Sequence, residues 1–90
     1  MRVSVVVPAY NESATQERCL AAVYDRNPGL DLEVIVVDDG SSDATPAVLA
    51  AQKRPGLKAL RHAENRGKGA AIRTGLAAAT GDIVLIQDAD

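Results

Sequence analysis

Short apolar runs alternate with amphipathic segments along the chain. Three runs are rich in β-branched residues and nearly continuous, and they cover residues 3–7, 32–37 and 83–86. Continuous apolar runs of this length are typical of strands covered on both faces, as in parallel sheets. A weaker run at residues 57–60 alternates with charge, which favours an edge strand.

The segments between these runs carry the signals of helices. A capping-box pattern at residues 13–16 begins the first helix, and the Pro-Gly pair at 28–29 follows it. Cap and first-turn signals at residues 42–46 predict a second helix, which the Pro-Gly pair at 55–56 stops. The apolar face of the first helix is formed by Cys19, Leu20, Val23 and Tyr24.

A third helix is predicted over residues 68–79. Ile72 and Leu76 lie four positions apart on its apolar side, and Gly81 is its expected stop. The order β-α-β-α-β-α-β predicts an α/β domain over residues 1–90, with an open, mostly parallel, Rossmann-like sheet.

Acidic residues follow the last strand, at the edge where open parallel sheets bind ligands. Asp88 and Asp90 are two positions apart, so in an extended segment they project to one side with Cα atoms about 6.6 Å apart. Such a pair can merely solvate a strand end. Placed after the most apolar run of the chain, it favours a site for Mg²⁺ or Mn²⁺, which prefer oxygen ligands and accept substrate phosphates.

Two other strand ends carry candidate binding residues. A glycine turn and a helix cap explain the residues after Asp39, but not the adjacent acids Asp38 and Asp39 themselves. One of these acids could accept hydrogen bonds from a base or from ribose hydroxyls. Pro8 is either a strand terminator or part of a site, and Tyr10 is either a packing aromatic or a wall for a planar base.

The glycine-rich segment at residues 65–71 places Lys68 at a helix start, where backbone N–H groups favour anions. A capped turn without function has the same composition, and the spacing is not that of a P-loop. His62 has no metal-ligand partners in the sequence and is expected to be exposed.

Composition narrows the classes of function. The 90 residues are 47% hydrophobic and 24% charged, which is typical of one small globular domain. The net charge of −2 argues against general nucleic-acid binding. A single cysteine, Cys19, favours a reducing compartment such as the cytoplasm, and no run reaches the ~18 apolar residues of a membrane span. The basic residues nevertheless cluster at Arg61, Arg66, Lys68 and Arg73.

Four segments together resemble the family 2 glycosyltransferases, and most of all the polyprenyl-phosphate (dolichol-phosphate-type) mannosyl and glucosyl transferases. They are VVPAYNE, VIVVDDGSSDAT, NRGKGAAIRTG and GDIVLIQDAD, in this order. The resemblance implies the amino-terminal half of a GT-A fold and metal-dependent, inverting transfer from a GDP-mannose or UDP-glucose type of donor to a lipid phosphate. It assigns Asp88 and Asp90 to the metal. The residues that it assigns to the nucleotide sugar are Pro8, Tyr10, Glu12, Asp39, Lys68 and Asp88.

The acceptor site, general base and membrane attachment of this family follow the acidic metal motif. Residues 1–90 are therefore expected to be the donor-binding part of a longer enzyme, nearly or wholly inactive alone, with no catalytic residue identified. The intact protein is expected in the cytoplasm or at the cytoplasmic face of a membrane.

Other classes share acids at the end of a parallel sheet. A nucleotidyltransferase or a dinucleotide-binding oxidoreductase usually has a glycine-rich loop after the first strand, whereas residues 8–13 contain no glycine. A phospho-acceptor signalling module would have its acid pair after the first strand rather than the second. A fragment that folds without any activity is the remaining alternative.

Overall fold

The computed structural model describes residues 1–11, 13–26, 29–43, 47 and 54–87. The second predicted helix falls almost wholly on residues outside these ranges. The described elements are β1 (Arg2–Ala9), α1 (Ser13–Arg26), β2 (Asp31–Asp38), β3 (Leu57–Arg61), α3 (Lys68–Ala78) and β4 (Ile83–Ile86).

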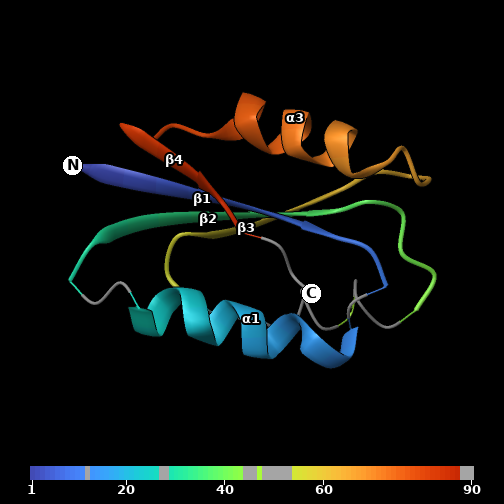
Figure 1. Ribbon diagram of the computed structural model, residues 1–90, viewed down its shortest axis with the longest axis horizontal. Coiled ribbons are helices and arrows are strands. Elements are labelled where there is room, and N and C mark those ends of the chain that lie inside the picture. The colour runs from blue at the N-terminus through green and yellow to red at the C-terminus, as the bar shows by residue number, and fades with distance from the viewer. Residues whose placement is uncertain (12, 27–28, 44–46, 48–53, 88–90) are drawn as a thin grey trace.

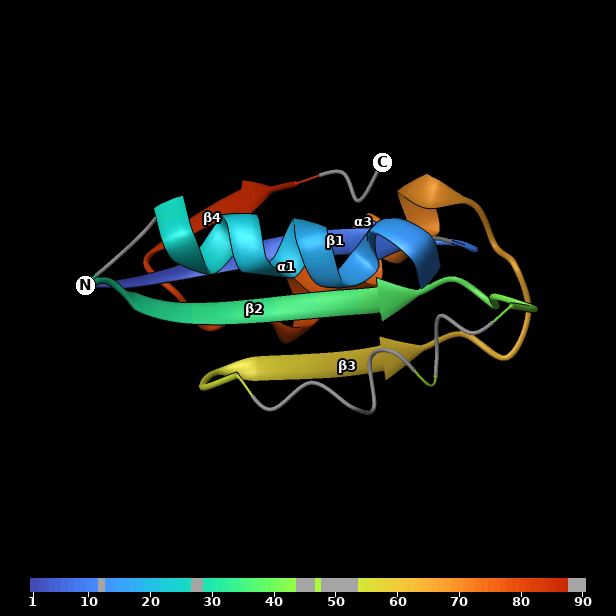
Figure 2. The same cartoon turned by 90° about the horizontal axis from the view of Figure 1, so that it is seen from below.

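The four strands form one parallel sheet in the order β3-β2-β1-β4, which Figure 2 shows side by side. Val5 on β1 pairs with Val34 on β2 and with Leu85 on β4. The sheet thus grows outward from β1 on both sides, first through β2 and β3 and then through β4. This confirms the predicted open parallel sheet, with β3 as an edge strand.

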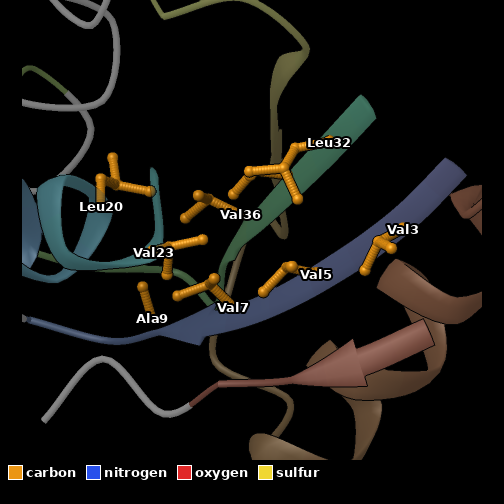
Figure 3. Close-up of a cluster of buried hydrophobic side chains, with 9 residues drawn as sticks. Val3, Val5, Val7, Ala9, Leu20, Val23, Leu32 and Val36 are labelled. Atoms are coloured by element: carbon orange, nitrogen blue, oxygen red, sulfur yellow. The ribbon is translucent and has the colours of Figure 1, made fainter. Parts of the chain in front are cut away.

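The helices α1 and α3 cover opposite faces of the sheet (Figure 1). Because side chains alternate along a strand, the odd-numbered residues of β1 point toward α1. There they pack with Leu20 and Val23 of the helix, as predicted, and Cys19 and Tyr24 pack against the same cluster. Figure 3 shows eight labelled members of this cluster, namely Val3, Val5, Val7, Ala9, Leu20, Val23, Leu32 and Val36.

The α3 face of the sheet is covered through small residues. The helix buries Ala71 and Gly75, and a Cβ added at Gly75 would overlap the Cγ1 atom of Val6 on β1. The prediction that Ile72 and Leu76 form the buried side of this helix was therefore wrong, because Ile72 is only half-buried and Leu76 is exposed. Close approach of the helix backbone to the sheet selects small side chains here, which a search for large apolar residues overlooks.

The carboxyl end of α3 also differs from its prediction. The helix ends at Ala78, and Ala79 takes an extended conformation, so the helix stops before the predicted signal at Gly81. Gly81 has a packing role instead, since a Cβ there would lie 2.6 Å from Ser4 Oγ.

The strand β4 is an exposed edge. Its four apolar side chains are between 39 and 51% exposed, so the prediction that this run is covered on both faces was wrong. None of the described helices combines the length and the apolar character that crossing a bilayer requires.

Candidate functional site

The carboxyl ends of β1 and β2 lie side by side. Ala9 pairs with Asp38 in the parallel register, and the Asp39 N–H donates to the Ala9 carbonyl oxygen at 2.8 Å. Gln87, the residue after β4, continues alongside β1, because its N–H donates to the Val6 carbonyl oxygen at 2.9 Å. The carboxyl ends of β1, β2 and β4 thus lie at the same end of the sheet.

Asn11 joins the turn after β1 to the turn after β2. Its N–H donates to Ser41 Oγ, and its Oδ1 atom accepts from the Ser42 N–H, both at 2.9 Å. The Asn11 backbone has a φ of 51°, which asparagine tolerates better than most residues. Asn11 was not among the predicted site residues, although an asparagine two positions after the end of a strand was the available signal.

Asp38 is buried and contacts its own turn. Its Oδ1 atom accepts from the Ser41 N–H at 3.0 Å, and its Oδ2 atom lies 3.9 Å from Arg61 Nη1. Within the described part of the chain, that Oδ2 atom has no hydrogen-bond partner. Arg61 also donates through Nη2 to the Ser41 carbonyl oxygen at 3.1 Å, so a cation stands beside the acid pair.

Asp39 is 3% exposed and anchors the segment that leads into α3. Its Oδ1 atom accepts from the Arg66 N–H at 2.9 Å, and its Oδ2 atom accepts from the Gly67 N–H at 2.8 Å. Burial raises the pKa of Asp39, but the hydrogen bonds from His62, Arg66 and Gly67 outweigh it and leave the pKa below its usual value. Asp39 is therefore an ionised carboxylate at neutral pH.

His62 is buried, so the expectation that it is exposed was wrong. It is 8% exposed, its Nδ1 atom lies 2.7 Å from Asp39 Oδ1, and its Nε2 atom lies 2.8 Å from Thr74 Oγ1. Its backbone N–H also donates to the Asp38 carbonyl oxygen at 2.9 Å, which extends the contact between β2 and β3. No local signal marks this position, because both side-chain partners are distant in sequence.

The structure brings the described candidates to one end of the sheet. Pro8 is buried in β1, and Tyr10, just beyond that strand, is 46% exposed. Asp39 holds the residue before Lys68, which is the exposed first residue of α3. The described side chains contain no group of three or more His, Cys, Asp and Glu residues that could hold a metal ion. The candidates outside the described residues are Glu12, Asp88 and Asp90.

Comparison with known sequences identifies related proteins over the whole chain. The model of the family described as "Glycosyl transferase family 2" matches residues 4–90. A dolichyl-phosphate beta-glucosyltransferase of Drosophila melanogaster is 43% identical over 101 residues, which cover 100% of this chain and 31% of that protein. A dolichol-phosphate mannosyltransferase of Pyrococcus furiosus is 36% identical over 92 residues, which cover 100% of this chain and 26% of that protein.

A solved structure has the same fold over nearly the whole chain. It is the mannosyltransferase PcManGT from Pyrobaculum calidifontis in complex with GDP-Man and Mn²⁺. The TM-score is 0.87 and the identity 43%, over 98% of this chain and 27% of that one. The chain thus spans between 26 and 31% of the length of these three proteins.

Proposed function

The chain belongs to glycosyl transferase family 2, and we propose that it forms the donor-binding part of an enzyme that transfers a sugar from a nucleoside diphosphate sugar. One observation carries this proposal. The end of β1, the buried Asp39 carboxylate and the start of α3 are joined by hydrogen bonds at one end of a parallel sheet. Open α/β sheets bind their ligands at this end.

Different described residues are suited to bind the base and the diphosphate of the donor. Tyr10 is half-exposed beside the site, and its ring is a stacking surface for the base. A carboxylate has about four acceptor positions, and three contacts of Asp39 leave one for a base N–H. Lys68 and the N-terminus of α3 attract the diphosphate. In this arrangement Pro8 and Glu12 frame the nucleotide.

We assign Asp88 and Asp90 to a divalent cation, Mg²⁺ or Mn²⁺. The hydrogen bond from Gln87 to Val6 supports this assignment, because it directs the chain along β1 toward the site just before these acids. Their carboxylate oxygens are ligands that both ions prefer. When bound, the ion would neutralise the charge that develops on the diphosphate leaving group.

The proposed reaction is transfer with inversion at the anomeric carbon. An acceptor oxygen forms the new bond to that carbon, and the bond to the diphosphate breaks, so the nucleoside diphosphate leaves with its electron pair. Two relatives are named for dolichyl or dolichol phosphate, and a polyprenyl phosphate is the proposed acceptor. This chain would contribute donor binding, and we assign the role of general base to none of its residues.

Donor binding tests the proposal directly. We expect calorimetric titration of the chain with GDP-mannose and with UDP-glucose to detect binding of at least one, and Mn²⁺ to tighten it. The double variant Asp88→Asn, Asp90→Asn should lose the effect of Mn²⁺, whereas Asp25→Asn, an exposed carboxylate on α1, should retain it. Failure of both sugars to bind, or equal binding by the double variant with Mn²⁺, would contradict the proposal.

A further inference from the structure

A chain of polar side chains runs beneath α3. It starts at Asp39 after β2, passes through the ring of His62 after β3, and ends at Thr74 on α3. The two contacts measure 2.7 and 2.8 Å, and the imidazole between them is 8% exposed. Buried polar contacts of this kind are costly to leave incomplete, so they restrict the geometry of all three groups.

The contact with Asp39 requires a proton on one particular nitrogen of the imidazole ring. The ionised Asp39 carboxylate can only accept, so the Nδ1 atom of His62 must carry a proton. In the neutral ring, the Nε2 atom then accepts from the hydroxyl of Thr74. Of the two neutral tautomers, only the one with its proton on Nδ1 satisfies both partners in this ring orientation.

The same carboxylate determines where α3 begins. Asp39 holds the N–H groups of Arg66 and Gly67, and the next residue is Lys68. The turn at Gly40, directly after Asp39, packs closely against the segment before α3, because a Cβ added at Gly40 would lie 2.5 Å from the Asn65 nitrogen. His62 therefore acts on both ends of this arrangement, on the carboxylate through Nδ1 and on the body of α3 through Nε2.

We propose that His62 is a positioning residue for nucleotide binding. It orients the Asp39 carboxylate toward the base and holds the start of α3, with Lys68, at the diphosphate. His62 acts through these groups, since both of its ring nitrogens already have protein partners. This inference rests on the proposed function and names a determinant of its donor site.

Four variants separate the two contacts. His62→Leu removes both, and His62→Asn restores a donor near the position of Nδ1 only. Thr74→Val removes the hydroxyl with little change of shape, and Thr74→Ser retains it. Val23→Ala, in the core on the α1 face, is a control for loss of stability away from the site.

Affinity for GDP and UDP in the presence of Mn²⁺ is the first measurement. We expect His62→Leu to weaken binding by about tenfold or more, as for loss of a hydrogen bond to a charged group, and His62→Asn to recover part of it. Thr74→Val should weaken binding less, and Thr74→Ser should match the wild type. Val23→Ala should bind within about twofold of the wild type at temperatures where it stays folded, since it changes packing only.

Nuclear magnetic resonance supplies a second measurement that needs no nucleotide. The ¹⁵N signals of the wild-type His62 ring should show the Nδ1–H tautomer, and the amide signals of Arg66 and Gly67 should move in His62→Leu. The Nε2–H tautomer, unmoved amide signals, or wild-type affinity in His62→Leu would overturn the inference. If the wild-type chain binds neither nucleotide, the proposed function fails, and the tautomer and amide signals still decide whether His62 positions Asp39.

Discussion

Glu33 Oε2 lies 2.7 Å from Lys58 Nζ, across the boundary between β2 and β3. The Glu33 side chain is 1% exposed, and it also accepts hydrogen bonds from Ser4 Oγ on β1 and from the N–H and hydroxyl of Thr80 before β4. A buried charge is tolerated when it is paired and hydrogen-bonded in this way. Glu33 thus connects three strands and the segment before the fourth, at the end of the sheet opposite the candidate site.

The ionisation of Glu33 should make the stability of the fold sensitive to acid. The hydrogen bond from Lys58 is the largest cause, followed by that from the Thr80 N–H. With the weaker contributions of the Ser4 and Thr80 hydroxyls, they lower the pKa of Glu33 from 4.5 to about 2 despite its burial. Because this pKa is lower in the folded state, the stabilisation is present above pH 4.5 and is lost as the pH falls toward 2.

We therefore expect Glu33→Gln to lower the free energy of unfolding at pH 7 by roughly 2 kcal/mol, a value reduced for the half-exposed Lys58. Its stability should also vary less than that of the wild type as the pH falls below 4.5. Urea unfolding at several pH values measures both effects, with Asp25→Asn, an exposed carboxylate on α1, as the control. An unchanged urea midpoint in Glu33→Gln at pH 7 would show that the network contributes nothing.

Gly75 should be intolerant of even one added carbon. Gly75→Ala would place a Cβ against Val6 and push α3 away from the sheet, so we expect a loss of about 1–3 kcal/mol. Gly69→Ala, in the first turns of the same helix, meets only the end of the Arg73 side chain at 3.4 Å. There the gain in helix propensity should stabilise the protein by about 0.5–1 kcal/mol. Thermal unfolding of both variants should give shifts of opposite sign.

Gly40 should matter for the site as well as for stability. Gly40 and Gly29 both have a positive φ, of 76° and 77°, so alanine costs about 1–2 kcal/mol of backbone strain at either position. Only at Gly40 would the Cβ also collide with the segment around Asn65. We expect Gly40→Ala to weaken nucleoside diphosphate binding and Gly29→Ala to leave it unchanged. Equal affinities, measured by calorimetry at a temperature where both variants are folded, would argue against a fixed loop.

The Asn11 side chain should hold the two turns of the site together. Asn11→Ala removes the acceptor for the Ser42 N–H and strains a backbone with φ of 51°, so we expect a loss of about 1–3 kcal/mol in the free energy of unfolding. Asn11→Gly relieves the strain but also lacks the acceptor, so its free energy of unfolding should lie between those of Asn11→Ala and the wild type. Asn11→Asp keeps an acceptor and should come nearest to the wild type. Thermal unfolding ranks the three variants, and a loss in Asn11→Asp equal to that in Asn11→Ala would exclude the acceptor role.

The predictions from sequence succeeded where a local pattern carries the cause. The β-branched runs predicted β1, β2 and β4, and the alternating charge at Lys58 predicted an edge strand. They failed where burial depends on a neighbour: Leu76 is exposed because Gly75 faces the sheet, and β4 is exposed because it lies at the edge. An apolar run predicts a strand, but its place in the sheet decides how much of that strand is covered.

The sequence by itself determined the alternating order of strands and helices and the strand ends at which its acids lie, because periodicity, caps and turns act within a few residues. Only the tertiary structure decided what those acids contact. The partners of Asp39 are 23 to 28 positions later in the chain. His62 meets Asp39 and Thr74 because β3 lies beside β2, and α3 packs against β1 and β2. Such contacts follow from the path of the backbone in space, which no local pattern contains.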